Sequence, residues 1–252
     1  MLIKNGKFWL GDCLELMKDI PNGSVDMILC DLPYGTTACK WDTVIPFEPL
    51  WKQYWRIAKP NAAIVLFGSE PFSSHMRISC LDKFKYDWVW YKSKAMNFQQ
   101  AKNSPLRKHE MVSIFSKGVV GHVSQTKKRM TYNPQNLTEC SVFNQRKKQS
   151  KDEHNYQRDN GIVKGFIQTQ TGYDDTVLQF GNEHNPPHPT QKPVALFEYL
   201  IKTYTNEGET VMDNCAGSGT TAVACENTKR KWICIEQLPE YYYPAVMRVA
   251  AL

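Results

Sequence analysis

Long apolar runs, closely spaced cysteine pairs and internal repeats are all missing from this sequence of 252 residues. No stretch approaches the roughly 18 consecutive apolar residues of a membrane-spanning helix, and the first residues lack the apolar core of a signal peptide. We therefore expect no membrane partner and a cytoplasmic location. No low-complexity segment is present either.

Disulfide and metal sites are also poorly supported by the sequence. Its eight cysteines include no Cys-x-x-Cys pair, and Cys30, Cys215, Cys225 and Cys234 fall at expected strand or helix positions. Thiols at such positions are normally buried and reduced. The sequence therefore predicts free cysteines and no metal centre.

Short apolar strands alternate with helical segments along most of the chain, and 42% of the residues are hydrophobic. Strands are expected near 8–10, 25–30, 62–67, 86–91, 111–115, 211–213 and 231–235, and helices near 12–19, 47–58, 71–81, 193–204, 220–227 and 239–249. Alternation of this kind predicts an α/β fold, a mostly parallel doubly wound sheet with helices on both faces. Ligands bind such sheets beyond the carboxyl ends of the strands, where Asp12, Asp31, Asp213 and Glu236 all fall.

A carboxylate, a proline and an aromatic ring follow the apolar run 25–30 in the tetrapeptide Asp31-Leu32-Pro33-Tyr34. Such a group is suited to hold a flat, weakly nucleophilic amine. The Asp31 carboxylate accepts one N–H, the Leu32 carbonyl accepts the other, and Tyr34 stacks on the ring, while Pro33 fixes the turn. The same residues also suit an ordinary strand-to-loop turn, so the tetrapeptide alone leaves the function open.

A second chemical signal lies far downstream, where residues 211–222 read as a short strand, a turn of small residues and the start of a helix. Gly217 and Gly219 allow a ligand to approach the backbone closely, and the helix N-terminus favours an anionic group. Glu236 ends the next strand, at the position where an acidic side chain binds ribose hydroxyls. The pattern predicts an adenosine-containing cofactor, and it fits both NAD and S-adenosylmethionine.

Together the two segments resemble the amino DNA methyltransferases, whose catalytic tetrapeptide is (Asp/Asn/Ser)-Pro-Pro-(Tyr/Phe) and whose cofactor loop is Asp-Pro-Phe-x-Gly-x-Gly-Thr. The tetrapeptide precedes the loop here, as in the β-class members. Three further segments agree in order: 11–15, 105–110 and 188–193. The resemblance covers nearly the whole chain except about 117–185, and it implies a Rossmann-like class I methyltransferase fold that is circularly permuted.

The chain departs from the family pattern at two places. Leu32 replaces the first proline of the tetrapeptide, and Asn214-Cys215 replaces the Pro-Phe of the cofactor loop. The first change leaves a less rigid turn, and the second removes an aromatic contact to the adenine of the cofactor. Neither change removes a polar group that the chemistry needs.

The resemblance implies a site-specific DNA methyltransferase that moves a methyl group from S-adenosyl-L-methionine to adenine N6 after base flipping, because a leading Asp is typical of the adenine-N6 enzymes and Ser of the cytosine-N4 enzymes. Asp12 and Cys13 would meet the adenine of the cofactor, and Glu236 its ribose. Thr190 and Lys192 would hold its methionine carboxylate. The expected catalytic residues are Asp31, Leu32, Pro33 and Tyr34. The expected cofactor-binding residues are Asp12, Cys13, Asp31, Thr190, Lys192, Asp213, Ala216, Gly217, Ser218, Gly219, Thr220, Glu236 and Gln237.

Positive charge is concentrated between the two motif halves. Residues 92–185 hold 15 Lys or Arg against 8 Asp or Glu, whereas the rest of the chain holds 16 against 17. Such a density attracts DNA phosphates, although a single basic triplet is ordinarily a solvated surface. The expected DNA-binding residues are Lys127, Lys128, Arg129, Arg146, Lys147 and Lys148. We expect a catalytic half at 1–116, a basic target-recognition insertion at 117–185 and a cofactor-binding half at 186–252.

Other functions remain open at this point. They are a cytosine-N4 DNA methyltransferase, an NAD-binding oxidoreductase, an RNA or protein amide methyltransferase, and a DNA-binding regulator without catalytic activity. The oxidoreductase leaves the tetrapeptide unexplained, and the regulator does not account for an intact Asp31 and glycine loop. Double-stranded DNA is the expected partner. β-class relatives are often dimers, so a homodimer and a companion restriction endonuclease stay open as further partners.

Overall fold

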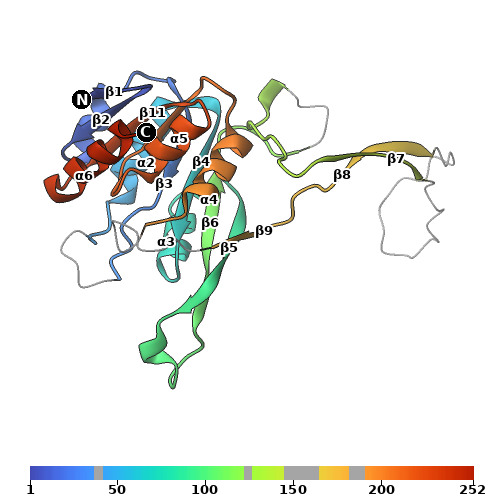
Figure 1. Cartoon of the computed structure of the whole chain (residues 1–252), viewed down its shortest axis with the longest axis horizontal. Helices are drawn as coiled ribbons and strands as arrows, with labels where there is room; N and C mark the ends of the chain where they lie inside the picture. Colours follow the sequence, from blue (N-terminus) through green and yellow to red (C-terminus); the bar gives the residue numbers. More distant parts are fainter. Residues whose placement is uncertain (37–41, 122–126, 145–164, 182–190) are drawn as a thin grey trace. The chain divides into compact units, whose positions relative to one another are not determined.

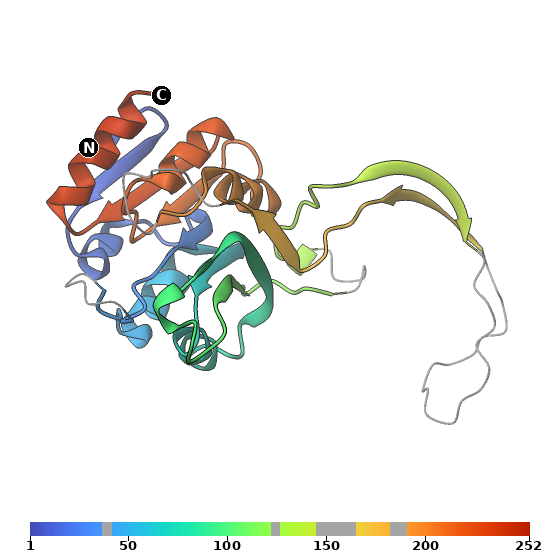
Figure 2. The same ribbon diagram turned by 60° about the horizontal axis from the view of Figure 1, so that its bottom comes forward.

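The computed structural model of the protein describes residues 1–36, 42–121, 127–144, 165–181 and 191–252. The chain divides into two compact units, one formed by Met1–Asn133 with Asp175–Leu252 and the other by Pro134–Asp174. In the first unit, helices cover both faces of a central sheet (Figures 1 and 2). This arrangement confirms the predicted α/β class with a mostly parallel sheet.

The main sheet of the described residues has the strand order β1-β2-β11-β10-β3-β4-β6-β5-β9. Neighbouring strands pair in parallel except in the pairs β1–β2, β4–β6 and β5–β6. The strands are β1 (Leu2–Ile3), β2 (Gly6–Leu10), β3 (Val25–Cys30), β4 (Ala58–Gly68), β5 (Phe84–Met96), β6 (Arg107–Phe115), β9 (Val177–Phe180), β10 (Thr210–Asp213) and β11 (Lys231–Glu236). Strands β10 and β11 therefore lie between β2 and β3, although they come from the far end of the sequence.

The central strands are apolar because they are covered on both faces. All six residues of β3 are buried, as expected for a strand in the middle of a parallel sheet. Met27 and Leu29 face one core cluster and Ile28 and Cys30 the other, since successive side chains of a strand point to opposite faces.

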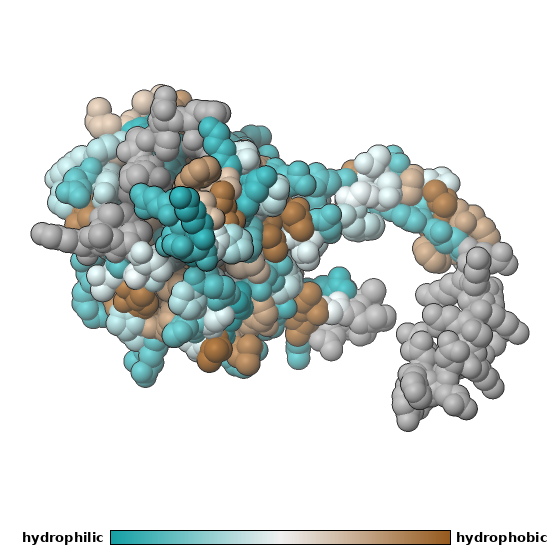
Figure 3. Space-filling view, turned by 90° about the horizontal axis from the view of Figure 1, so that it is seen from below, coloured by the Kyte–Doolittle hydropathy of each residue, from teal (hydrophilic) through white to brown (hydrophobic). Residues whose placement is uncertain are grey.

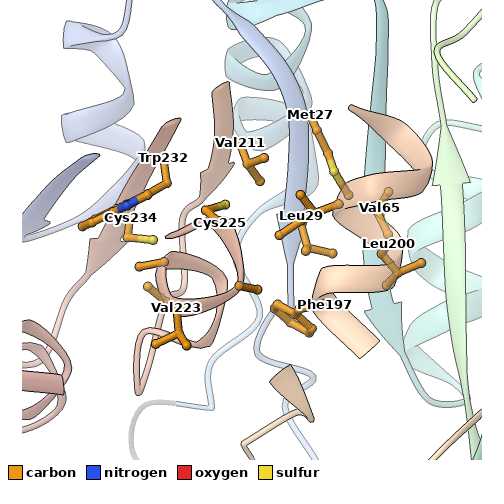
Figure 4. Close-up of a cluster of buried hydrophobic side chains, with 14 of the residues drawn as sticks. Met27, Leu29, Val65, Phe197, Leu200, Val211, Val223, Cys225, Trp232 and Cys234 are labelled. Carbon is orange, nitrogen blue, oxygen red and sulfur yellow. The ribbon is translucent and has the colours of Figure 1, made fainter. Parts of the chain in front are cut away.

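Each face of the sheet is covered by its own set of helices. Apolar residues of α4, α5 and α6 join the core cluster that contains Met27 and Leu29, and those of α2 and α3 join the other. Figure 4 shows Phe197 and Leu200 of α4 beside β3, and Val223 and Cys225 of α5 near Trp232. The helices are α1 (Cys13–Leu16), α2 (Phe47–Ile57), α3 (Phe72–Ile78), α4 (Val194–Tyr204), α5 (Thr220–Asn227) and α6 (Pro239–Ala250), with short 3-10 turns at Met17–Asp19 and Phe98–Gln100. No helix in these described ranges is long and apolar enough to cross a membrane.

The second unit is a two-stranded antiparallel ribbon, β7 (Thr138–Asn144) with β8 (Phe166–Thr171). Most of its strand residues are exposed, and brown, apolar surface appears along it (Figure 3). The unit covers a shorter range of residues, Pro134–Asp174, than the insertion expected at 117–185. The reason is that β9, inside that range, pairs with β5 in the main sheet.

Candidate active site

The parallel pairings bring the sequence motifs to one edge of the sheet. Met212 of β10 lies opposite Ile28 of β3, so the tetrapeptide and the glycine turn both follow at the carboxyl edge. On the other side of β10, strand β11 ends at Glu236, which lies opposite Leu10 of β2. The segments that begin at Gly11, 237, 214 and 31 are therefore neighbours in that order.

The tetrapeptide is held by its own side chains. Leu32 is buried in the core, and the Tyr34 hydroxyl donates a 2.6 Å hydrogen bond to Asp31 Oδ1. The Tyr34 ring stacks on Phe72, with ring centroids 5.0 Å apart. Burial and the Asp31 carboxylate raise the pKa of Tyr34 well above its usual value, so the phenol stays neutral and keeps its proton for this hydrogen bond.

A buried series of charges ends on Asp31. Lys192 Nζ lies 2.5 Å from Asp31 Oδ2 and 3.3 Å from Glu110 Oε2. Lys92 forms an ion pair with Glu110 Oε1. We call Lys92, Glu110, Lys192 and Asp31 the charge series. Burial would lower the pKa of Lys192, but the Asp31 and Glu110 carboxylates raise it above its ordinary value, so this ammonium stays charged.

The pKa of Glu110 is shifted downward by its two lysine neighbours. Burial would raise its pKa, but the ammonium groups of Lys192 and Lys92 hold it below its ordinary value. Each buried charge in the series is therefore compensated by a neighbour, as a buried ion requires.

The turn after β10 is fixed by Glu236. Gly217 N–H donates a 2.8 Å hydrogen bond to Glu236 Oε2, and Leu238 N–H donates one of 2.9 Å to Oε1. Gly217 and Gly219 have φ values of 50° and 76°, the left-handed region that favours glycine. Among the residues that the structure describes, no atom lies within 4 Å of a Cβ added to Gly217. The turn thus presents open space beside a carboxylate that still has free acceptor capacity, which fits an adenosine ribose.

Ser218 and Thr220 contact each other, and Ser218 also contacts Gln191 and Arg248. The Ser218 hydroxyl donates a 2.8 Å hydrogen bond to Gln191 Oε1, and its Oγ lies 3.3 Å from Thr220 Oγ1. Arg248 donates a 3.0 Å hydrogen bond to the Ser218 carbonyl. Ala216 is buried, whereas Gln237 is exposed. The segment that contains Lys192 is thereby tied to the glycine turn.

Asp12 acts as the N-cap of α1, where its Oδ1 accepts hydrogen bonds from Leu14 N–H (2.8 Å) and Glu15 N–H (3.2 Å). Next to it, Cys13 Sγ accepts a hydrogen bond from Asn214 Nδ2 at 3.6 Å. Asn214 Oδ1 in turn accepts one from the Tyr54 hydroxyl at 2.5 Å. The two residues that depart from the family's Pro-Phe thus lie against the turn that was expected to meet the adenine.

Asp213 is turned inward. Its Oδ1 accepts a 3.0 Å hydrogen bond from Cys215 N–H and its Oδ2 one of 2.5 Å from the Thr221 hydroxyl. Burial raises the pKa of Asp213 to about 6. These contacts favour a role in holding the turn, and the predicted contact with the amino group of a cofactor stays a prediction.

A pocket of about 210 Å³ lies at the same edge, where β4 ends and β6 begins. Its lining includes Gly68, Ser69, Arg107, His109 and Glu110. Since Glu110 belongs to the charge series, the pocket adjoins the side chains that lead to Asp31.

Asp12, Asp31, Asp213 and Glu236 lie at the carboxyl edge of the sheet, where the sequence predicted them. Several of the contacts around them were not predicted. Glu110, Lys92, Tyr54 and Arg248 were not expected as site residues. The signals for the first two were their positions, since Lys92 directly follows the predicted strand 86–91 and Glu110 ends the family-like segment 105–110 just before the strand 111–115. Thr190, Arg146, Lys147 and Lys148 lie outside the described residues, and the predicted Lys127, Lys128 and Arg129 are exposed.

Comparisons with known proteins place the sequence in a family. The family described as DNA methylase matches residues 25–247. The DNA adenine methyltransferase YhdJ of Escherichia coli (strain K12) is 29% identical over 258 residues, which cover 95% of this chain and 81% of YhdJ.

Two solved structures share the fold. The M1.HpyAVI–SAM complex has a TM-score of 0.64 at 24% identity, covering 96% of this chain and 99% of that one. The PvuII DNA methyltransferase, described as cytosine-N4-specific, has a TM-score of 0.70 at 18% identity, covering 98% and 86%. Because the family match spans most of the chain and agrees with the order of its motifs, the chain belongs to the N6/N4 DNA methylase family.

Proposed function

We propose that this protein is a site-specific DNA methyltransferase that transfers the methyl group of S-adenosyl-L-methionine to the N6 amine of adenine. The observation that carries the proposal is the parallel pairing of β3 with β10, because the segments that begin at Asp31 and at 214 then leave adjacent strands at the same carboxyl edge of the sheet. S-adenosyl-L-methionine supplies, when bound, a methyl group on a sulfonium that leaves without acid assistance.

The protein's own task in this reaction is to prepare the amine. An exocyclic amine donates its lone pair into the aromatic ring, so it is a weak nucleophile. Asp31 and the Leu32 carbonyl accept its two N–H groups and hold the lone pair toward the methyl carbon. The N–C bond forms as the C–S bond breaks, and one proton leaves the nitrogen for Asp31 or water. Orientation of this kind supplies several kcal/mol of barrier lowering, on the order of 10²-fold in rate or more.

The residues around the glycine turn fit the cofactor. Glu236 is a buried carboxylate whose two oxygens each accept one backbone N–H, leaving lone pairs for ribose hydroxyls. The open space at Gly217 admits the backbone contact, and Asp12 with Cys13 borders the same turn through Asn214. We propose these residues as the cofactor site.

The target base has to leave the duplex to reach Asp31, because its amine is otherwise paired. The pocket at Gly68 and Glu110 adjoins the charge series, and we place the extruded base between this pocket and Tyr34. The exposed Lys127, Lys128 and Arg129 support contact with DNA phosphates.

The identity of the base is the finer part of the proposal. A leading Asp in the tetrapeptide and the similarity to an adenine methyltransferase favour adenine N6. Cytosine N4 is the alternative, because the same fold occurs in an enzyme described as cytosine-N4-specific.

The test is to incubate the protein with S-adenosyl-L-methionine and genomic DNA of mixed sequence, digest the DNA and resolve the nucleosides by mass. The expected product is N6-methyldeoxyadenosine. N4-methyldeoxycytidine alone would overturn the choice of base, and no methylated nucleoside at all would overturn the methyltransferase. If no methylated nucleoside forms, calorimetric titration of the same preparation with NAD and with S-adenosyl-L-methionine shows whether the protein is instead an NAD-binding oxidoreductase.

A further inference from the structure

Lys192 makes contacts that differ from its predicted role at the methionine carboxylate of the cofactor. Its side chain is only 7% exposed, and its ammonium is placed between the carboxylates of Asp31 and Glu110 at 2.5 and 3.3 Å. It also lies over the aromatic rings of Phe67 and Tyr34, 5.3 and 5.9 Å from their centroids. The ammonium is thus held from several sides, with Asp31 as its nearest partner.

The Asp31 carboxylate is fixed at both oxygens. Tyr34 donates to Oδ1 and Lys192 to Oδ2, and the two donors come from different segments of the chain. A carboxylate bound at one oxygen can rotate about its last side-chain bond, whereas binding at both oxygens sets its plane. Each oxygen keeps a further lone pair, so a substrate N–H can still be accepted.

The rest of the charge series explains why Lys192 points at Asp31. Glu110 is bound by Lys92 on its other side, so it is held in place by Lys92 and in turn holds Lys192. Buried ion pairs contribute little net stability compared with apolar packing. A buried series of two lysines and two carboxylates that ends on one half-buried aspartate is therefore better explained by a demand for geometry at that aspartate.

We propose that Lys192, itself positioned by Glu110 and Lys92, is the residue that orients the Asp31 carboxylate toward the target amine. Lys192 is a positioning residue that acts through Asp31. The inference rests on the proposed methyl transfer, in which Asp31 receives the amine.

The experiment measures kcat for methyl transfer to duplex DNA and, separately, the Kd for S-adenosyl-L-methionine by calorimetry. The variants are Lys192→Met, which keeps the side-chain length and removes the charge, Lys192→Arg, which keeps the charge, and Glu110→Gln. Misplacement of a reacting group by ~1 Å costs roughly 100-fold in rate, so Lys192→Met should lower kcat by about that factor. The Kd of Lys192→Met for the cofactor should stay near the wild-type value. Lys192→Arg should recover part of kcat. The kcat of Glu110→Gln should lie between those of the wild type and Lys192→Met.

A matched control is available at the opposite edge of the sheet. Lys59 Nζ binds the buried Asp26 carboxylate at 2.6 Å, and Asp26 belongs to β3, the strand that leads to Asp31. Lys59→Met removes the same kind of ion pair from the same strand and should leave kcat unchanged. Thermal melting checks that each variant is folded, and if Lys192→Met does not fold, Lys192→Arg and Glu110→Gln carry the test.

Two results would overturn the inference while leaving the proposed function intact. One is a Lys192→Met enzyme with wild-type kcat and a weakened cofactor Kd, which would make Lys192 a cofactor ligand as first predicted. The other is wild-type kcat and Kd in both Lys192→Met and Glu110→Gln. A wild-type protein that methylates no DNA would instead overturn the proposed function, and this inference with it.

Discussion

Asp213 ends β10 at the carboxyl edge of the sheet, and its carboxylate is bound within the turn that follows. The residue is 3% exposed, and its two carboxylate oxygens accept hydrogen bonds from Cys215 N–H and the Thr221 hydroxyl within the turn. Burial raises its pKa to about 6, because these hydrogen bonds only partly replace the water lost by a charged group.

A pH dependence of stability follows from this shift. The pKa of an unfolded aspartate is about 3.9, so between about pH 4 and 6 the native protein holds a proton that the unfolded chain has released. The contribution of Asp213 to the free energy of unfolding is fully present below about pH 4 and falls by about 2–3 kcal/mol as the pH rises through 6.

Urea denaturation of the wild type and Asp213→Asn between pH 4.5 and 7.5 checks this expectation, since the variant cannot titrate at this position. Relative to the wild type, Asp213→Asn should gain stability as the pH rises. A constant difference between the two proteins across the range would show that the buried carboxyl does not titrate as described.

At the scale of the elements, the turns after β2 and β10 meet through Cys13, Asn214 and Cys215. Asn214 Nδ2 donates to both sulfur atoms, at 3.6 Å to Cys13 and 3.4 Å to Cys215. The hydrogen bond from Cys215 and that from Asn214 outweigh burial and hold the pKa of Cys13 below its usual value. Cys13 is half-buried, and its lowered pKa favours the thiolate form, the form that reacts with alkylating reagents.

Alkylation of Cys13 therefore tests its place in the proposed cofactor site. Iodoacetamide should modify Cys13 faster than the buried Cys30, Cys225 and Cys234, and saturating S-adenosyl-L-methionine should slow only the reaction at Cys13. Peptide mass spectrometry gives the rate at each site. Cys140, which belongs to the second unit and is also half-buried, is the control. Equal rates at Cys13 with and without cofactor would remove Cys13 from the proposed site.

The elements that could be predicted from sequence are those with a buried apolar pattern. β3 occupies the predicted range 25–30, and α4 and α6 agree with their expected ranges within a residue or two. β7 and β8 were missed because most of their residues are exposed, so no apolar alternation marks them. The predicted helix 12–19 is instead α1 followed by a 3-10 turn.

The contacts of the site were harder to predict than its position. The tetrapeptide, the glycine turn and Glu236 have recognisable residue patterns. Because strands that alternate with helices are parallel, the residues that follow them lie at one edge of the sheet. The ion pair of Lys92 with Glu110 depends on the register of β5 and β6, in which Trp90 lies opposite Glu110. Register and side-chain direction are tertiary properties, so no local pattern reveals them.

At the scale of the whole molecule, the positive charge is unevenly distributed along the chain, with an excess only in residues 92–185. Within the described part of that range, Lys127 and Lys128 are exposed next to Arg129. Each phosphate contact that a lysine makes contributes roughly 0.9 to the slope of log affinity against log salt.

The double variant Lys127→Ala/Lys128→Ala should therefore bind duplex DNA more weakly and lower that slope by up to about 2. Fluorescence anisotropy at several salt concentrations measures it. Replacing Lys52 and Lys202, which are exposed on α2 and α4, removes the same charge outside the basic segment and should leave the slope nearly unchanged. Equal slopes in the two double variants would show that the loss of net charge alone accounts for the effect.

The topology of the main sheet joins residues from both ends of the chain, because β10 and β11 lie between β2 and β3. The central claim is that Asp31, from the first part of the chain, acts on the amine while the glycine turn, from the last part, holds the methyl donor. Asp31→Ala separates these two tasks, since it removes the acceptor for the amine and leaves the glycine turn in place.

The most direct measurement is a single turnover of enzyme preloaded with tritiated S-adenosyl-L-methionine and mixed with duplex DNA, with cofactor binding measured on the same preparation. Asp31→Ala should bind the cofactor with an affinity close to that of the wild type and transfer no detectable label to DNA. Transfer at a near-normal rate by Asp31→Ala would contradict the account.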